Sequence, residues 1–73
     1  MSRAVAIGDE RRLAGYALAG VEVLPAATDA EARTAWAGLD EETALVLLTP
    51  QAEHALADAW AERAACLRAV VPS

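Results

Sequence analysis

The stretch from Val5 to Val21, VAIGDERRLAGYALAGV, decides the fold of this chain. It begins with an unbroken apolar run, turns at Gly8 and Asp9, and continues with a helical spacing of apolar residues that closes on Gly20. An uninterrupted apolar strand followed directly by a helix is typical of a parallel sheet that is covered on both faces. The stretch therefore predicts the centre of an α/β sandwich.

Within this stretch we expect a strand from Arg3 to Gly8 and then a helix with Asp9 as its N-cap. The predicted inward face of the helix consists of Leu13, Ala14, Ala17 and Leu18. Gly15 is predicted to let the helix backbone approach the sheet closely. Gly20 is placed just past the helix end, where a left-handed conformation costs glycine little.

A second strand is predicted from Val21 to Ala26, at an edge of the sheet because Glu22 and Pro25 suit an edge better than a centre. Thr28 and Glu31 form the pattern of a capping box and predict the start of a second helix. The apolar stripe of this helix consists of Ala32, Ala35, Trp36 and Leu39.

The most apolar run of the chain, Ala44 to Leu48, predicts a second central strand. Thr49 as N-cap and Pro50 at the first helical position then predict a third helix. Its inward face is predicted to carry Ala52, Leu56 and Trp60, and its outer face His54, Asp58 and Glu62. The range from Cys66 to Val71 predicts a last strand.

The alternation of strands and helices predicts right-handed crossovers and a four-stranded parallel sheet in the order 2-1-3-4. We expect one domain over residues 1–73, a small three-layer α/β sandwich like half of a Rossmann or flavodoxin-like fold. Both tryptophans are predicted to lie in its core. At this length a domain buries only about 60% of the surface its unfolded chain exposes, so a partner surface would add to its stability.

Composition restricts the classes of partner. The net charge is −5 and the chain has no lysine, so it lacks the basic patch that binds a nucleic acid or an anionic membrane. No apolar run is long enough to cross a bilayer, and the N-terminus lacks the apolar stretch of a signal peptide. We therefore expect a cytoplasmic protein without direct membrane insertion. The single Cys66 is interpreted as a small buried hydrophobe.

The opening of the chain resembles that of the F subunit of the V/A-type (vacuolar/archaeal-type) rotary ATPases. The resemblance rests on a strand that ends in I-G-D and a helix that carries G-[aromatic]-x-L-A-G-V. The matching residues are Ile7, Gly8, Asp9, Gly15, Tyr16, Leu18, Ala19, Gly20 and Val21. Members of that family often carry Phe and Arg where this chain has Tyr16 and Ala17.

The resemblance implies a non-catalytic component of the central stalk. Such a component docks on the coiled-coil D subunit, lies beside the catalytic ring, and contributes to coupling ATP hydrolysis or synthesis to ion transport. Family members continue after the last strand into a C-terminal helix that contacts the rotor or the catalytic ring. The 73 residues end before that helix, so we expect the docking role rather than regulation of hydrolysis.

Two phosphate-binding alternatives concern the carboxyl ends of the central strands. A nucleotide loop needs several glycines after the strand, but after Gly8 the next glycine is Gly15, inside the predicted helix. A receiver-like phosphorelay domain would use Asp9 and Glu10 to hold a divalent cation. Its phospho-accepting aspartate would stand where this chain has Thr49, and its lysine cannot exist in a lysine-free chain. A stand-alone receiver-like protein-interaction or regulatory module without a phosphorylation site is the alternative that stays open.

The remaining polar residues predict no catalytic, cofactor or metal site. His54 and Asp58 lie one helical turn apart, which is typical of a solvated pair, and Cys66 has no further cysteine to share a zinc ion. We therefore expect a non-enzyme that works through its surfaces. One candidate partner surface is the edge strand with Val21, Glu22, Val23 and Leu24; the other is the outer face with His54, Asp58 and Glu62.

Overall fold

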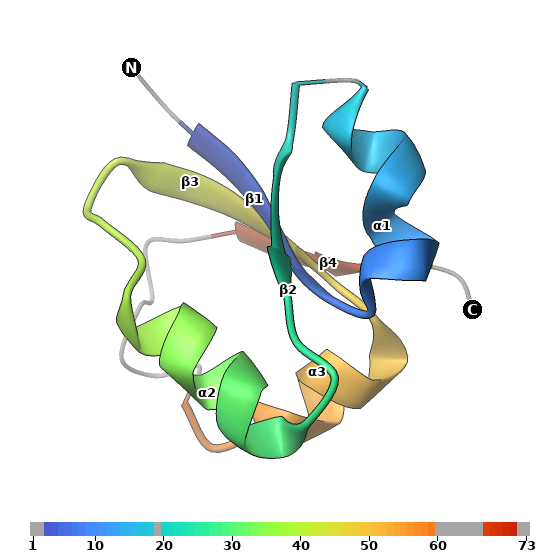
Figure 1. Ribbon diagram of the computed structural model, residues 1–73. Coiled ribbons are helices and arrows are strands. Elements are labelled where there is room, and N and C mark those ends of the chain that lie inside the picture. The colour runs from blue at the N-terminus through green and yellow to red at the C-terminus, as the bar shows by residue number, and fades with distance from the viewer. Residues whose placement is uncertain (1–2, 19, 60–66, 72–73) are drawn as a thin grey trace.

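Strands and helices alternate along the chain in the computed structural model, which describes residues 3–18, 20–59 and 67–71 (Figure 1). The strands are β1 (Arg3–Gly8), β2 (Glu22–Pro25), β3 (Thr43–Leu48) and β4 (Leu67–Val70). The helices are α1 (Glu10–Ala17), α2 (Asp29–Ala37) and α3 (Pro50–Ala55). None of the described helices is long and apolar enough to span a bilayer.

The four strands form one parallel sheet in the order β2-β1-β3-β4, which is a flavodoxin-like arrangement. Val5 pairs with Val46 and Ile7 with Leu48, so the two apolar runs are interior, parallel and adjacent. The predicted strand order and both predicted edge strands are confirmed. Strand β2 is one residue shorter at each end than expected: Val21 and Ala26 lie just outside it.

The central strands divide their side chains between two cores, because successive residues of a strand point to opposite faces. The larger core lies between the sheet and the pair α2 and α3, which lie beneath the sheet in Figure 1. Its residues include Val5, Ile7, Val46, Leu48, Trp36 and Leu56. The smaller core lies under α1 and consists of Ala6, Leu13 and Val71, with Tyr16, Val21, Val23 and Leu47 packed against it. The three predicted layers are thus present.

The inward face of α1 is narrower than predicted. Leu13 is fully buried and Tyr16 is half-buried, whereas Ala14 and Ala17 are exposed and Leu18 is 92% exposed. The prediction for Ala14, Ala17 and Leu18 was therefore wrong. Leu13 and Tyr16 are three residues apart and lie on one side of the helix, which leaves the next rows outside.

The prediction for Gly15 was also wrong. Gly15 is exposed, and a Cβ atom added there would meet nothing within 4 Å, so no close approach to the sheet occurs. Gly20 behaves as expected: its φ of +88° is left-handed, and it follows the C-cap Leu18 by two residues. The amide of Val21 then donates to the carbonyl of Tyr16 at 3.2 Å, which brings the chain back to the sheet.

The helix starts follow the sequence closely. The Asp9 carboxylate accepts from the Arg11 amide at 2.9 Å, and the Thr49 hydroxyl accepts from the Ala52 amide at 3.3 Å. At α2 both halves of the capping box are present between Thr28 and Glu31. These bonds satisfy amides that have no partner within their helix.

The end of the third helix differs from the prediction. Helix α3 stops at Ala55, and the chain continues through turns to Ala59. Leu56 is buried as expected, but it is the C-cap, and Asp58 lies outside the helix. The predictions for Ala19, Trp60, Glu62 and Cys66 lie outside the described residues.

Candidate partner-binding surfaces

The carboxyl ends of β1 and β3 meet where a flavodoxin-like sheet usually binds its ligand. A depression of about 340 Å³ lies here, lined by Asp9, Arg12, Thr49, Pro50 and Gln51. The Asp9 carboxylate caps α1, and the Thr49 hydroxyl, on a residue that is 2% exposed, caps α3. Both side chains are thus engaged in forming the helix starts.

The backbone geometry at the carboxyl end of β1 explains why glycine stands at position 8. Its φ is +147°, a conformation that side-chain-bearing residues rarely adopt, and a Cβ atom there would overlap the side chain of Thr49. The carbonyl of Gly8 accepts from the Ala26 amide at 2.8 Å. Gly8 therefore brings the ends of β1, β2 and β3 together. Among the described residues, no group of three or more His, Cys, Asp or Glu side chains could hold a metal ion.

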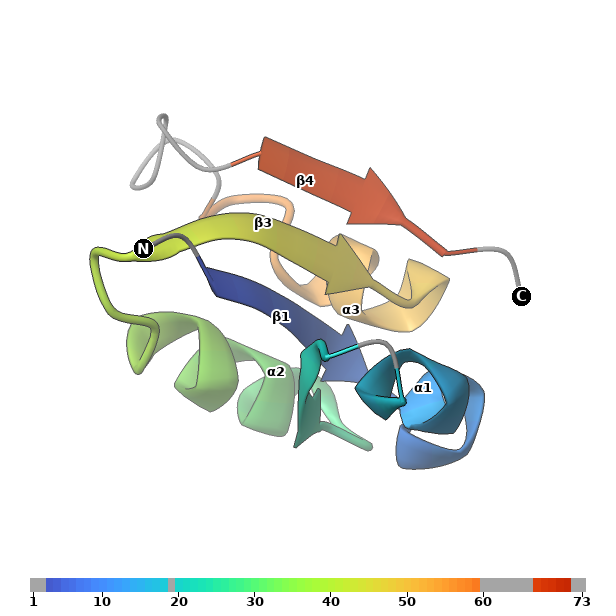
Figure 2. The ribbon, with the colours of Figure 1, turned by 90° about the horizontal axis from the view of Figure 1, so that it is seen from above.

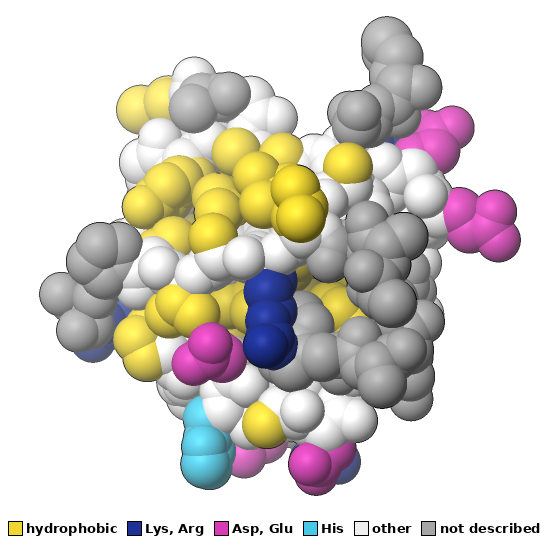
Figure 3. Space-filling view, turned by 180° about the vertical axis from the view of Figure 1, so that it is seen from behind, with side chains coloured by type: hydrophobic (Ala, Val, Ile, Leu, Met, Phe, Trp, Pro, Cys, Tyr) yellow, Lys and Arg dark blue, Asp and Glu magenta, His cyan; other side chains and the backbone are white. Residues whose placement is uncertain are grey.

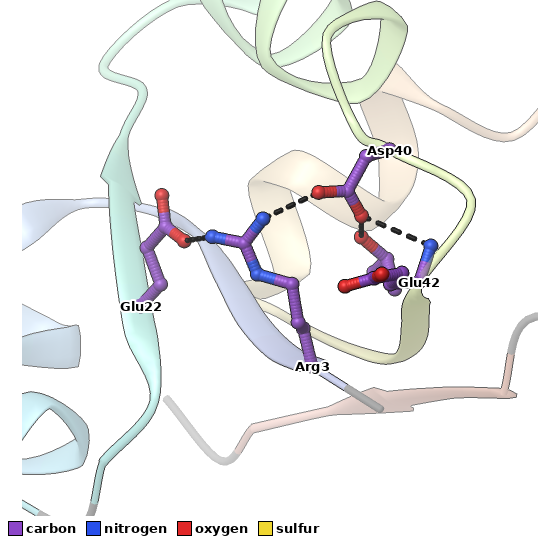
Figure 4. A network of polar contacts seen from close by, with 5 residues as sticks. Arg3, Glu22, Asp40 and Glu42 are labelled. Atoms are coloured by element: carbon purple, nitrogen blue, oxygen red, sulfur yellow. Dashed lines mark hydrogen bonds and ion pairs between the residues drawn. The ribbon is translucent and has the colours of Figure 1, made fainter. Parts of the chain in front are cut away.

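The opposite end of the sheet, where the strands begin, carries a network of charged side chains (Figure 4). Arg3 of β1 donates to Glu22 of β2 at 2.6 Å and to Asp40, which lies between α2 and β3. Asp40 also accepts from the amide of Glu42 at 3.0 Å and from the hydroxyl of Thr43 at 3.2 Å. One guanidinium thus joins the starts of three neighbouring strands.

This network shifts two pKa values. The hydrogen bond to Asp40 and the charges of Asp40 and Glu22 raise the pKa of Arg3. Desolvation acts to raise the pKa of Asp40, but the hydrogen bond and charge of Arg3, together with the bonds from Thr43 and Glu42, outweigh it and lower that pKa. The side chains of Arg3, Glu22 and Asp40 are about half exposed, so solvent screens their attraction. The network joins the strand starts and contributes little to the free energy of folding.

The first predicted partner surface, along β2, is an edge strand as expected. Val21, Val23 and Leu24 are half-buried. Glu22 is exposed, and its carboxylate accepts a hydrogen bond from Arg3. A groove of about 420 Å³ lies between this strand and α2. It is lined by Leu24, Pro25, Ala30, Glu31, Thr34 and Ala35. The side chains of Val21 and Val23 instead pack toward α1.

The second predicted partner surface, on α3, is brought together only in part. His54 and Asp58 are both exposed, and no hydrogen bond or ion pair joins these two described side chains. His54 lines a shallow hollow of about 430 Å³ with Arg68 of β4. His54 and Asp58 do not share one helix face, because α3 ends at Ala55, and Glu62 lies outside the described residues.

Sequence reasoning missed a third surface, an apolar face of the sheet on the α1 side. Figure 3 shows hydrophobic side chains gathered in a band across the upper part of this view. The face, which we call the open sheet face, consists of Leu45 and Leu47 of β3 and Leu67 and Ala69 of β4. The number of crossover helices on each side of the sheet would have predicted this face. Of the described helices, only α1 lies on this side, while α2 and α3 both lie on the other.

Comparison of the chain with protein-family models, with curated proteins and with solved structures found no match in any of the three.

Proposed function

We propose that this domain is a non-catalytic protein-binding module that docks on a coiled-coil partner, and that the partner is the D subunit of a V/A-type rotary ATPase. The proposal places it in the cytoplasm, at the central stalk beside the catalytic ring, where it contributes to rotary coupling of ATP hydrolysis or synthesis to ion transport. The name of the partner comes from the resemblance of the sequence around Val5 to Val21 to the F subunit of such ATPases.

The observation that carries the proposal is how the domain uses its polar and apolar groups. At the carboxyl ends of the strands, Asp9 and Thr49 serve as helix caps. Elsewhere the domain leaves large apolar side chains of β4 exposed, with Leu67 at 72% and Val70 at 41%. Apolar surface that is left in water on a small domain favours a protein partner over a small polar ligand.

The motif residues of the resemblance have physical roles in this fold. Ile7 is fully buried, Gly8 has the conformation that the turn into α1 requires, and Asp9 caps that helix. Tyr16 packs on the smaller core, and Gly20 is left-handed. The motif therefore describes how the first unit folds, and it supports a shared fold more directly than a shared partner.

A stand-alone receiver-like interaction module is the second candidate, favoured by the flavodoxin-like strand order. The position at the end of β3 speaks against phosphoryl transfer in such a module, because Thr49 is 2% exposed and its hydroxyl is engaged with Ala52. Genomic neighbours that encode ATPase catalytic subunits and a coiled-coil D-like protein would favour the stalk; their absence would favour the stand-alone module.

Thermal unfolding with and without the D subunit of the same organism tests the function. A ligand that binds only the folded state raises its stability, by about 2.7 kcal/mol at a hundred times the dissociation constant. We expect a higher melting temperature and a 1:1 complex with the D subunit, and no shift with ATP, ADP or acetyl phosphate in the presence of magnesium. A shift with one of the small molecules and none with the D subunit would contradict the proposal.

A further inference from the structure

The open sheet face is defined by the register of β3 and β4. Leu47 packs against the core under α1, while Val46 and Leu48 belong to the opposite core, so Leu45 points to the α1 side together with Leu47. Leu67 pairs with Leu45, and Ala69 with Leu47. These four residues therefore lie side by side on one face of two neighbouring strands.

Helix α1 covers only the other half of this side of the sheet. It packs on β1 and β2, where Leu13 and Tyr16 contact the smaller core. In the view from above, β3 and β4 lie in front of α3, and no described helix lies over them (Figure 2). Leu67 is 72% exposed and Ala69 is exposed, whereas Leu45 and Leu47 are half-buried.

The size of the open sheet face matches one helix. Neighbouring strands are about 4.8 Å apart, so two strands span about 10 Å, which is the diameter of a helix with its side chains. The four residues of β4, which pair with Leu45–Leu48 of β3, extend over about 13 Å, the length of a helix of about nine residues. A parallel sheet is normally covered by helices on both faces. One helix laid beside α1 would complete this layer.

Charge indicates the chemistry of that helix. The four residues of the open sheet face are uncharged, so the covering surface must be apolar. At the end where β3 begins, Glu41 and Glu42 are exposed, while the neighbouring Asp40 is engaged with Arg3. The whole chain carries a net charge of −5. An apolar stripe with Lys or Arg at the end that meets Glu41 and Glu42 would be complementary to this surface.

We propose that the open sheet face is the docking site of one amphipathic helix of the coiled-coil partner, with a basic end against Glu41 and Glu42. This inference rests on the proposed function, from which it takes the D subunit as the partner. It replaces the β2 edge and the outer side of α3 as the main contact. The docked helix buries Leu67 and Ala69 and closes the layer that α1 begins.

Leu67→Glu and Leu18→Glu make a matched pair for the test. Both replace an exposed leucine by the same charge, but Leu67 lies on the open sheet face and Leu18 at the C-cap of α1. Binding of the D subunit is measured by calorimetry for the wild type and both variants, after circular dichroism has shown that all three fold. We expect Leu67→Glu to weaken binding by about tenfold or more, and Leu18→Glu by less than about twofold.

Two further variants report on orientation and folding. Ala69→Glu places a charge beside Leu67 and is expected to weaken binding similarly, which keeps the test valid if Leu67→Glu does not fold. The double variant Glu41→Lys, Glu42→Lys is expected to slow association with the D subunit and to reduce its dependence on salt, because it removes the acidic attraction at one end. An unchanged association rate and salt dependence would contradict the proposed orientation.

The outcomes separate this inference from the proposed function. If the D subunit does not bind the wild type, both fall. If it binds the wild type, Leu67→Glu and Ala69→Glu equally well, the docking site is elsewhere and only the inference falls. Sedimentation of the chain alone adds one more outcome. A stable dimer that Leu67→Glu dissociates would show that a second copy covers the open sheet face, and would also overturn the inference.

Discussion

Single residues with unusual surroundings explain where this chain turns and how its strands are joined. Gly8 ends β1 with a φ of +147° against the side chain of Thr49, and Gly20 reverses the chain after α1 with a φ of +88°. Arg3 joins the starts of the strands through Glu22 and Asp40. The two ends of the sheet are thus fixed in different ways, by backbone conformation at one and by charge at the other.

The substitution Gly8→Ala is expected to destabilise the domain by about 1–3 kcal/mol or more, because it adds backbone strain and a clash with Thr49. Gly15→Ala is the control. Gly15 is exposed within α1 with open space around it, so alanine there is expected to gain about 0.5–1 kcal/mol. Urea unfolding followed by circular dichroism measures both. Equal effects of the two substitutions would contradict the role of Gly8.

Asp40 is expected to make the stability depend on acid pH. Its pKa is lowered in the folded protein, so the stabilisation it provides is present above its ordinary pKa, near 4, and is lost as the pH falls through the lower folded value. The melting temperature of the wild type is expected to fall in this range, and less in Asp40→Asn. High salt should reduce the difference, because the pair is half exposed. Parallel curves for the two proteins would contradict this expectation.

Helices and strands show which parts of the structure the sequence could predict. The strand order, the three caps and the stripe of α2 followed from strong local signals such as the unbroken run Ala44–Leu48 and the pair Thr28 and Glu31. The inward face of α1 did not follow, because alanine and glycine suit either side of a helix. The end of α3 at Ala55 did not follow either, because the alanine-rich sequence after Pro50 favours a helix that continues.

The partner surfaces were harder to predict than the fold. A continuous apolar run such as Ala44–Leu48 normally indicates a strand covered on both faces. Here β3 is covered fully on one face only, and the half-buried Leu45 and Leu47 belong to the open side. No local pattern distinguishes the two cases, because coverage depends on how many helices cross on each side of the whole sheet.

The larger core depends on Trp36 of α2, which is 3% exposed as predicted. Trp36→Ala is expected to cost about 3–5 kcal/mol, because the cavity that it leaves lies between the sheet and two helices. Leu18→Ala, at a residue that is 92% exposed, should change the stability by less than about 0.5 kcal/mol. Denaturant unfolding of the two variants makes the comparison. A loss below about 1 kcal/mol for Trp36→Ala would mean that the ring is not part of the core.

At the scale of the whole molecule, the two cores are held together by the same strands. β1 gives Val5 and Ile7 to the larger core and Ala6 to the smaller one, and β3 contributes to both in the same way. Unfolding of β1 or β3 therefore exposes residues of both cores at once. Two cross-helix bonds, from Gln51 to Asp29 at 3.2 Å and from Arg33 to the carbonyl of Ala55 at 3.3 Å, also join α2 to α3.

This shared sheet predicts that the domain unfolds in one cooperative step despite its small size. Far-ultraviolet circular dichroism, which reports on all helices, and fluorescence of Trp36 in a Trp60→Phe background, which reports on the larger core, should give the same midpoint in urea. The slope of the free energy with urea should be near the low end of the usual range, about 1 kcal/mol per molar, because a short chain exposes little surface. Two separate midpoints would show that the layer of α1 melts independently. In that case β1 and β3 would not couple the two cores, and a partner helix on the open sheet face would stabilise only the α1 side.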